Sequence, residues 1–390
     1  MSVAARIVER IRRTGPITFA ELQSIALYDP EGGFFTTGGG AGRAGRDFVT
    51  SPETGSLFGM LVARRLDATW RELGEPDPFV VVDAGAGRGK LAADVLRAKP
   101  ACLPALRYVL VERSPALRAL QRELLELEPS DEALGPFAPG EGPSDAVEPL
   151  ARSGPIVTSI DDLPGITFSG VIVANELLDD LPVRIVERAD DRWDEVLVTL
   201  SGDGRRLATT TVPAPPALAA EADLVAVGNP VPTGARLPLP EAAIEWLERV
   251  AVILTRGEVM IFDYVVPVTE LLARGQGGWL RTYRAHAPGS DPLDDPGTQD
   301  ITADLPLEYV LDSARRAGFS VARDMTQREL LSDLGIDELV EEGRAIWRAR
   351  AHLGDLEAIA GRSRASEAAA LTDPTGLGAH RVIILRRGLG

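Results

Sequence analysis

The sequence predicts an α/β fold in which helices cover both faces of a mostly parallel sheet. Short apolar runs alternate along the chain with longer segments of helical periodicity, which is the pattern of strand–helix–strand units. Three of these runs, at residues 79–82, 108–111 and 170–174, are each followed directly by an acid or an amide. Because the carboxyl ends of parallel strands meet at one edge of a sheet, we expect these polar side chains to gather there, where open α/β sheets bind ligands.

The composition is that of a soluble globular protein. Of the 390 residues, 45% are hydrophobic and 25% are charged. No apolar run approaches the ~18–20 residues that span a bilayer, and the charged N-terminus lacks the apolar core of a secretory signal. Cys102 is the only cysteine, which excludes an internal disulfide and a cysteine-based zinc cluster. His286, His352 and His380 are too scattered for a metal motif, so we expect no metal and a cytoplasmic location.

The chain carries a formal net charge of −17. Such a charge repels phosphate backbones, so nucleic acid is not expected as the main partner. A cationic acceptor is more compatible with this charge, although many soluble proteins are acidic for solubility alone. A homodimer is also compatible with the sequence.

The N-terminal part predicts a helical cap ahead of the sheet. One helix is predicted over residues 3–12. A second is predicted over residues 18–27 and begins with a Thr-Phe-Ala-Glu capping box. An aromatic turn and a glycine-rich stretch follow. Ser51 and Pro52 then begin a third predicted helix, which runs to residue 73 and stops at a glycine.

A glycine-rich turn follows the first predicted strand of the sheet. Asp83 ends that strand, and Gly85, Gly87 and Gly89 come at alternate positions before a helical pattern begins at Lys90. Glycine lets the backbone approach a ligand closely, and the helix N-terminus faces the same place. A dinucleotide-binding turn would need glycine at position 90, and a phosphate-binding P-loop would need glycine at 84. An ordinary tight strand–helix connection is the alternative that involves no ligand.

The second predicted strand supports a ligand at this turn. Glu112 follows its apolar run, 23 residues beyond Gly89. An acid at about this distance accepts hydrogen bonds from ribose hydroxyls in nucleotide-binding folds. Ser114 and Pro115 predict the start of the next helix. The apolar face of that helix is predicted to consist of Leu117, Leu120, Leu124 and Leu127.

The rest of the chain continues the alternation of strands and helices. Strands are predicted at residues 156–158, 170–174, 183–187, 195–200, 206–212, 258–262, 319–322 and 380–385, and helices at 241–254, 307–317 and over most of 327–370. The stretch 213–216 is predicted as a turn and 275–302 as a long loop. The predicted regions are an N-terminal cap at 1–75, a core at 76–325 with insertions at 128–155 and 188–240, and a C-terminal helical segment with a final strand at 326–390.

Several segments resemble the MidA-like methyltransferases that use S-adenosylmethionine (SAM), the family of the mitochondrial complex I assembly methyltransferase. They are LYDPEGGFF at 27–35, RDFVTSPETGSLFG at 46–59, VVDAGAGRGKLAADVLRA at 81–98, ANELLDDLPV at 174–183 and the YRAH…DPLDDPGTQDIT loop at 283–302. The resemblance implies a class I, Rossmann-like SAM methyltransferase fold and methyl transfer to a protein arginine. The chain departs from the family at Lys90, at residues 83–86, at 263–265 and at 303–305. The last two departures lie on the expected acceptor side, so a small-molecule acceptor is the alternative.

The strand ends and the resemblance together predict the site residues. The predicted cofactor-binding residues are Ser51, Pro52, Asp83, Gly85, Gly87, Gly89, Glu112, Asp161 and Asn175. Glu176 and Asn175, after the fourth strand of the sheet, are predicted to be catalytic, as are Asp47 and Glu53 in the segment that resembles a cofactor-covering loop. A carboxylate in such a place accepts the N–H groups of a guanidinium. Helix-start stabilisation and loop solvation are the alternatives for these acids.

Two other classes of function fit parts of the pattern. An NAD-dependent oxidoreductase is disfavoured by Lys90 and by the lack of a recognisable hydride-site histidine. A SAM-binding assembly factor without turnover would carry the same cofactor turn as an enzyme.

Overall fold

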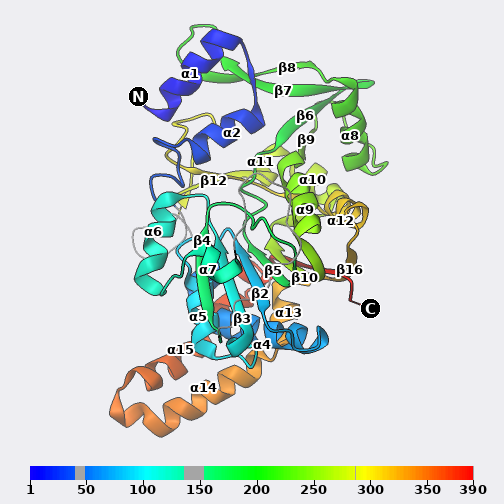
Figure 1. The fold of residues 1–390 in the computed structure, drawn as a ribbon. Helices are drawn as coiled ribbons and strands as arrows, with labels where there is room; N and C mark the ends of the chain where they lie inside the picture. The colour runs from blue at the N-terminus through cyan, green and yellow to red at the C-terminus, as the bar shows by residue number, and fades with distance from the viewer. Residues whose placement is uncertain (40–48, 136–152, 286, 390) are drawn as a thin grey trace. The chain divides into compact units, whose positions relative to one another are not determined.

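The computed structural model of the protein describes residues 1–39, 49–135, 153–285 and 287–389. The backbone forms two compact units, each assembled from segments that are far apart in the sequence (Figure 1). The first unit comprises Met1–Phe48, Leu177–Arg249 and Tyr264–Ala317, and the second comprises Val49–Glu176, Val250–Asp263 and Gly318–Gly390. The three sequence regions named above stay a prediction.

The second unit is built on a seven-stranded sheet in the order β16-β17-β10-β5-β2-β3-β4. The strands are β2 (Phe79–Ala84), β3 (Leu106–Val111), β4 (Ile156–Ile160), β5 (Phe168–Asn175), β10 (Leu254–Asp263), β16 (Ser320–Thr326) and β17 (Arg381–Arg387). The strands from β10 to β4 pair in parallel, whereas β17 is antiparallel to both of its neighbours. The predicted α/β fold with a mostly parallel sheet is therefore confirmed.

The strand order places a ligand site at the centre of this sheet. The chain runs from β2 outward through β3 and β4, and then returns to the other side of β2 to form β5. This reversal between β2 and β5 is a topological switch point, which is where open α/β sheets bind ligands beyond the carboxyl ends of their strands. Ala84 of β2 lies opposite Ala174 of β5, so Asn175 follows at the same edge as the glycine turn.

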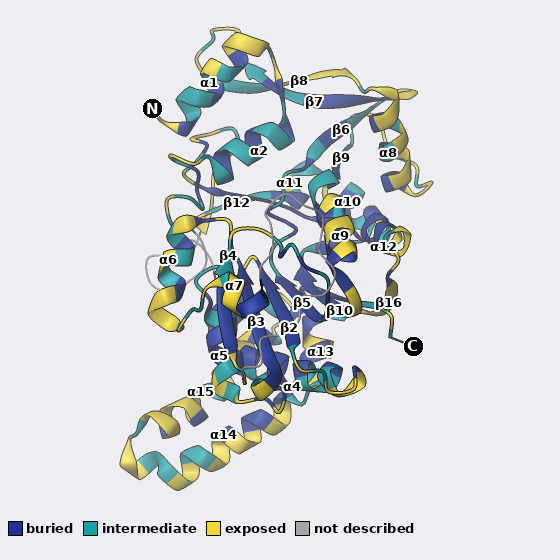
Figure 2. Ribbon diagram, in the orientation of Figure 1, coloured by how far each residue is buried: buried dark blue, intermediate teal, exposed yellow. Residues whose placement is uncertain are grey.

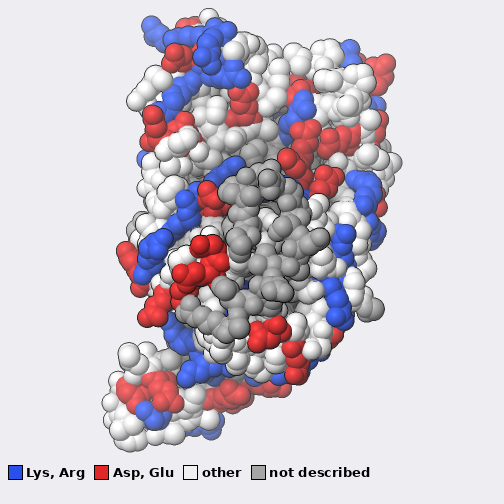
Figure 3. Space-filling view, in the orientation of Figure 1, with Lys and Arg blue, Asp and Glu red and all other residues white. Residues whose placement is uncertain are grey.

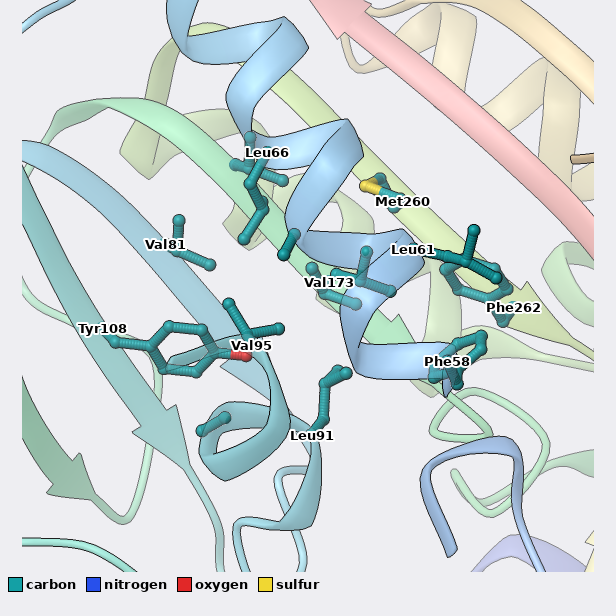
Figure 4. Packing of buried hydrophobic residues seen from close by; sticks show 14 of the residues in the cluster. Phe58, Leu61, Leu66, Val81, Leu91, Val95, Tyr108, Val173, Met260 and Phe262 are labelled. Atoms are coloured by element: carbon teal, nitrogen blue, oxygen red, sulfur yellow. The ribbon is translucent and has the colours of Figure 1, made fainter. Parts of the chain in front are cut away.

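Helices of the second unit pack against this sheet or against one another. They are α3 (Ser51–Thr54), α4 (Leu57–Glu72), α5 (Lys90–Ala98), α6 (Pro115–Leu124), α7 (Ser130–Leu134), α13 (Gln327–Asp333), α14 (Ile336–Arg350) and α15 (Leu356–Leu371), with short 3₁₀ turns η1 (Leu103–Ala105), η2 (Ala351–Leu353) and η3 (Leu377–Ala379). Figure 4 shows side chains of α4 and α5 lying over the apolar side chains of β2, β5 and β10. Phe58 of α4 meets Phe262 of β10 edge to face, with ring centroids 5.3 Å apart. Each such buried side chain contributes about 1.5–3 kcal/mol of transfer free energy.

The strands at the centre are buried on both sides. Every residue of β2 and β3 is buried, as Figure 2 shows for the middle of the sheet. Central strands of a parallel sheet have this pattern because helices or other segments cover both faces. The apolar runs that predicted these strands are continuous because both faces of each strand are buried.

The predicted helix over residues 52–73 is wrong at its start, because the segment forms two helices. Gly55 separates α3 from α4 and has an extended backbone with φ 165°. A side chain at this position would collide with Glu367 of α15, since a Cβ would lie 2.1 Å from the Glu367 carboxyl carbon. The same Glu367 carboxylate accepts a hydrogen bond from the Leu57 N–H at 2.9 Å and so caps α4. The break depends on a residue more than 300 positions away, which local sequence does not reveal.

The first unit contains smaller sheets and their covering helices. Its elements are α1 (Val3–Thr14), β1 (Ile17–Thr18), α2 (Phe19–Tyr28), β6 (Arg184–Ala189), β7 (Arg192–Leu200), β8 (Leu207–Pro213), α8 (Pro216–Ala226), β9 (Arg236–Leu239), α9 (Glu241–Ile253), β11 (Val265–Val266), α10 (Val268–Arg274), α11 (Gln276–Trp279), β12 (Leu280–Arg284), β13 (Ala287–Pro288), β14 (Asp300–Ala303), β15 (Leu305–Pro306) and α12 (Leu307–Arg316), where α9 continues past the end of the unit. Strands β1, β7, β6 and β9 pair in that order, and β8 pairs with β7. The strand predicted at 206–212 is confirmed as β8.

One prediction in this unit is wrong, and one helix was not predicted. The long loop predicted at 275–302 contains α11 and the strands β12, β13 and most of β14, which form a three-stranded sheet. Polar residues alternate with buried ones along β12, so no apolar run marks it. The buried Asp304 carboxylate next to this sheet pairs with Arg274 and Arg281 and holds it together. The turn at 213–216 leads directly into helix α8, which the sequence did not predict.

The surface carries charged side chains of both signs. On the face seen in Figure 3, acidic and basic side chains of the described residues are interspersed. Within the described part of the chain, we find no helix long and apolar enough to span a bilayer.

Candidate cofactor site

The glycine turn after β2 adopts the backbone conformation that its glycines permit. Gly85, Gly87 and Gly89 have φ angles of 74°, 54° and 81°, in the left-handed region where a Cβ is disfavoured. At Gly89 a Cβ would also lie 3.0 Å from Leu125, so this glycine serves packing within the protein. Among the described residues, no atom lies within 4 Å of a Cβ built at Gly87. The open side of Gly87 is therefore the part of the turn that a cofactor can approach.

Glu112 joins the glycine turn to the end of β3. Its Oε2 accepts a hydrogen bond from the Gly87 N–H at 2.9 Å, and its Oε1 accepts one from the Ser114 N–H at 2.8 Å. Burial raises the pKa of Glu112 to about 7, even though these two hydrogen bonds lower it. An ionised carboxylate has about four acceptor positions, so this one retains capacity for ligand hydroxyls.

Asp83 is a second buried acid beside Glu112. It lies in β2 with 3% of its surface exposed, and Tyr108 Oη donates a hydrogen bond to its Oδ2 at 3.2 Å. Burial raises the pKa of Asp83 to about 7, and the charge of Glu112 adds to this rise. Two neighbouring carboxylates with raised pKa values are stabilised by ligand groups that donate hydrogen bonds or carry positive charge. The hydroxyls and the ammonium group of SAM have this chemistry.

Asn175 and Glu176 lie at the carboxyl end of β5. The Oδ1 of Asn175 is buried and has no hydrogen-bond partner among the described residues, whereas its Nδ2 donates to Glu176 Oε1 at 3.2 Å. A buried amide oxygen without a partner is uncommon and is consistent with a ligand donor in the complete site. Glu176 has a φ of 51°, and its N–H donates to the Phe262 carbonyl at 2.8 Å. The residues present therefore fit a bound SAM.

The segment before α4 also reaches the glycine turn. Glu53 of α3 is buried, and its Oε1 lies 3.7 Å from the Nε of Arg88 within the turn. Ser51 donates to the side chain of Gln327 at 2.8 Å. Pro52 occupies the first turn of α3.

The contacts described above do not connect two of the predicted site residues to the glycine turn. Asp161 follows β4 at the same sheet edge but is exposed. Asp47 lies outside the described residues.

Gln121 is a residue of this site that sequence reasoning missed. Its side chain is fully buried, its Nε2 donates to the Gly87 carbonyl at 2.7 Å, and its Oε1 accepts from Ser159 Oγ at 2.6 Å. The predicted apolar face of this helix is wrong beyond Leu117, because α6 ends at residue 124 and the buried residues are Leu117 and Gln121. A glutamine one helical turn after a buried leucine was the available signal.

Comparison with known proteins gives the family. The family model of S-adenosyl-L-methionine-dependent methyltransferases, Methyltransf_28, matches residues 61–324. The mitochondrial protein arginine methyltransferase NDUFAF7 homolog of Drosophila melanogaster is 30% identical over 333 residues, which cover 81% of this chain and 71% of its own. The mitochondrial protein arginine methyltransferase NDUFAF7 of Homo sapiens is 29% identical, over 85% of this chain and 73% of its own.

These relatives correct one prediction. They are named as mitochondrial proteins, which contradicts the cytoplasmic location expected from the sequence. A single cysteine excludes an intrachain disulfide, but it does not distinguish one reducing compartment from another.

A solved structure agrees with the fold and the cofactor. A protein from Burkholderia thailandensis, crystallised with bound S-adenosyl-homocysteine, is 30% identical to this chain, with a TM-score of 0.79, and the match covers 100% of this chain and 92% of that one. Together with the family match across the glycine turn, this likeness identifies SAM as the cofactor of the chain. The chain belongs to the MidA-like family of SAM-dependent methyltransferases.

Proposed function

We propose that this methyltransferase modifies an arginine side chain of a protein substrate. The observation that carries the proposal is the position of Glu176, an acid whose side chain is 8% exposed, at the carboxyl end of β5 and beside the switch point of the sheet. The relatives named protein arginine methyltransferases support the same acceptor. A guanidinium is planar and cationic, and carboxylates bind it through directed, charge-assisted hydrogen bonds.

The cofactor-binding roles form part of this proposal. Glu112 accepts hydrogen bonds from the ribose hydroxyls of SAM, which is supported by its free acceptor capacity beside Gly87. Asp83 lies toward the methionine end, and Asn175 offers its unpaired Oδ1 to a donor of the cofactor. The glycines, Ser51, Pro52 and Asp161 complete the predicted binding set.

The chain's residues must align the acceptor and exclude water. Bound SAM supplies a methyl group activated by its sulfonium, and transfer to nitrogen leaves S-adenosylhomocysteine. Glu176 accepts N–H groups of the guanidinium, orients one nitrogen toward the methyl group and accepts the proton that this nitrogen releases. Glu53 and Asp47 are proposed to assist from the covering segment.

The test adds the purified protein and methyl-labelled SAM to a lysate of cells that lack this protein. Transfer of the label to lysate proteins is then measured. We expect a labelled protein that yields methylarginine on hydrolysis. Label in small molecules would instead indicate a small-molecule acceptor, and SAM binding without label transfer would indicate an assembly factor. Light scattering of the purified protein tests whether it is a homodimer.

A further inference from the structure

A histidine of the C-terminal segment lies against the acid that follows β5. The Nδ1 of His380 is 3.9 Å from Glu176 Oε1, and these side chains are only 4% and 8% exposed. His380 lies outside the region 61–324 that the family model matches. The contact therefore connects Glu176 to a part of the chain for which the sequence suggested no role.

Glu176 has an unusual backbone conformation that its neighbours hold in place. Its φ of 51° is left-handed, which is uncommon for a residue with a side chain. Its N–H is bonded to the Phe262 carbonyl of β10, and its Oε1 accepts from Asn175. Strained residues of this kind persist where the surrounding structure fixes them, often at functional sites.

His380 is itself fixed by two further contacts. Both are made by its backbone: the backbone N–H of His380 donates to the Leu377 carbonyl at 3.2 Å, and the backbone carbonyl of His380 accepts from the backbone N–H of Gln327 at 2.8 Å. The buried Gln327 side chain accepts from Ser51 and donates to the Leu371 carbonyl at 3.0 Å. One set of hydrogen bonds thus holds both Ser51, in the segment predicted to cover the cofactor, and the histidine beside Glu176.

We propose that His380 is a positioning residue, whose imidazole fixes the orientation of the Glu176 carboxylate and keeps it ionised. An imidazolium next to a carboxylate favours the charged form of both groups. The contact is observed directly, and only its consequence for methyl transfer depends on the function proposed above. The C-terminal segment is then part of the acceptor side of the site.

Charged residues also lie on the elements that adjoin His380 and strand β17. Besides Glu176, the acids on strands β10 and β16 and helix α13 are Glu258, Asp263, Asp324, Glu329 and Asp333. The cation next in sequence, Arg381, is paired with Asp324.

The first experiment measures the imidazole of His380 in the intact protein by NMR and needs no acceptor. The chain has three histidines, so the resonances are assigned with the variants His286→Gln, His352→Gln and His380→Gln. We expect Glu176→Gln to lower the pKa of His380 by about one unit and to leave that of His352 unchanged. An unchanged His380 titration in Glu176→Gln would overturn the proposal.

The second experiment is a double-mutant cycle on single-turnover methylation of lysate proteins, with SAM affinity measured by calorimetry. We expect His380→Ala to lower turnover about tenfold without changing SAM affinity, and His380→Gln to retain more turnover because glutamine keeps an N–H donor. In the Glu176→Gln background, His380→Ala should have no further effect. His352→Ala, a change at an exposed histidine, is the matched control and should behave as the wild type.

The outcomes separate this inference from the proposed function. Equal losses from His380→Ala in both backgrounds would show a general structural effect and overturn the positioning role. Wild-type turnover in Glu176→Gln would remove Glu176 from the chemistry, whereas a shifted His380 titration in the same variant would still support the positioning contact. If both His380 variants fail to fold, the titration in Glu176→Gln decides.

Discussion

The carboxylate of Glu112 accepts a hydrogen bond from the N–H of Gly87 at 2.9 Å, so the acid after β3 directly holds the turn after β2. On the other side of the same residue, the Gly87 carbonyl accepts from Gln121 at 2.7 Å. The backbone of Gly87 is thus fixed by protein contacts, while no atom of the described part of the chain occupies the space beyond its Cα. A preformed turn of this kind binds a cofactor without having to be ordered first.

Substituting Gly87 should remove cofactor binding and leave the fold intact. Gly87→Val places a branched side chain on a left-handed backbone, which costs about 1–3 kcal/mol, but its Cβ meets no atom of the described residues within 4 Å. We expect SAM affinity to fall by about a hundredfold or more, equivalent to about 2.7 kcal/mol, in calorimetry. Gly202→Val is the control, because a Cβ at Gly202 also meets no atom of the described residues within 4 Å. Wild-type SAM affinity in Gly87→Val would place the cofactor elsewhere.

The stability of the ligand-free protein should fall as pH rises. Asp83 and Glu112 have folded-state pKa values of about 7, well above their unfolded values of about 4. Between these values the folded state binds more protons, so its free energy of unfolding decreases from about pH 4 to about pH 7. Each pKa unit of difference corresponds to about 1.4 kcal/mol, and urea unfolding at pH 5 and pH 8 measures the change.

Asp83→Asn isolates the contribution of one acid to this pH dependence. Asparagine has the same shape and still accepts from Tyr108 Oη, but it does not ionise. We expect a smaller loss of stability between pH 5 and pH 8 than in the wild type. Asp190→Asn removes an equal charge at an exposed position and should keep the wild-type slope. An Asp83→Asn variant with the wild-type slope would show that Asp83 does not titrate in this range.

Gln121→Leu should weaken both the fold and the binding of SAM. The change leaves the Gly87 carbonyl without its side-chain donor and removes the acceptor of Ser159. An unmade hydrogen bond at a buried group costs about 1–3 kcal/mol of unfolding free energy. We also expect SAM affinity to fall about tenfold, about 1.4 kcal/mol, because the turn is less well fixed.

Ser159→Ala is the control for Gln121→Leu. It removes the Ser159 bond alone and leaves Gln121 able to donate to Gly87. This variant should keep SAM affinity close to that of the wild type. If Gln121→Leu also binds SAM normally, Glu112 alone is sufficient to fix the turn.

The central sheet and the cofactor turn could be predicted from the sequence because their signals are local. The apolar runs of β2, β3 and β5 reflect strands covered on both faces, and each ends on a polar residue at one edge. The positive φ angles of Gly85, Gly87 and Gly89 explain why glycine is favoured at these positions. Their roles in cofactor binding, like those of the acids, stay a prediction for each residue.

The features that sequence reasoning missed depend on residues far apart in the chain. The break at Gly55 is explained by the distant Glu367. The hydrogen bond between Gln121 and Gly87 joins helix α6 to the glycine turn after β2. Strands β12 and β14 lack an apolar run and become regular only through pairing with each other. Neither propensity nor periodicity contains such information, because both describe neighbours in sequence.

Glu176→Gln should separate methyl transfer from cofactor binding. Glu176 follows β5 at the switch point, and its carboxylate is buried beside Asn175 and His380. Glutamine keeps the shape and the hydrogen bond from Asn175, but it removes the charge that would orient a guanidinium and accept its proton. Hydrogen bonds to charged groups contribute about 1.5–3 kcal/mol, so we expect single-turnover methylation of lysate proteins to slow about ten- to a hundredfold.

The SAM affinity of the same variant decides which role Glu176 has. Because the proposed partner of its carboxylate is the acceptor, calorimetry should give a wild-type SAM dissociation constant for Glu176→Gln. Glu126→Gln, at an exposed position, is the control for removal of one charge and should change neither quantity. A loss of SAM affinity would identify Glu176 as a cofactor ligand. Unchanged affinity with unchanged turnover would exclude it from the chemistry and leave Glu53, which lies beside Arg88 of the glycine turn, as the described acid to test next.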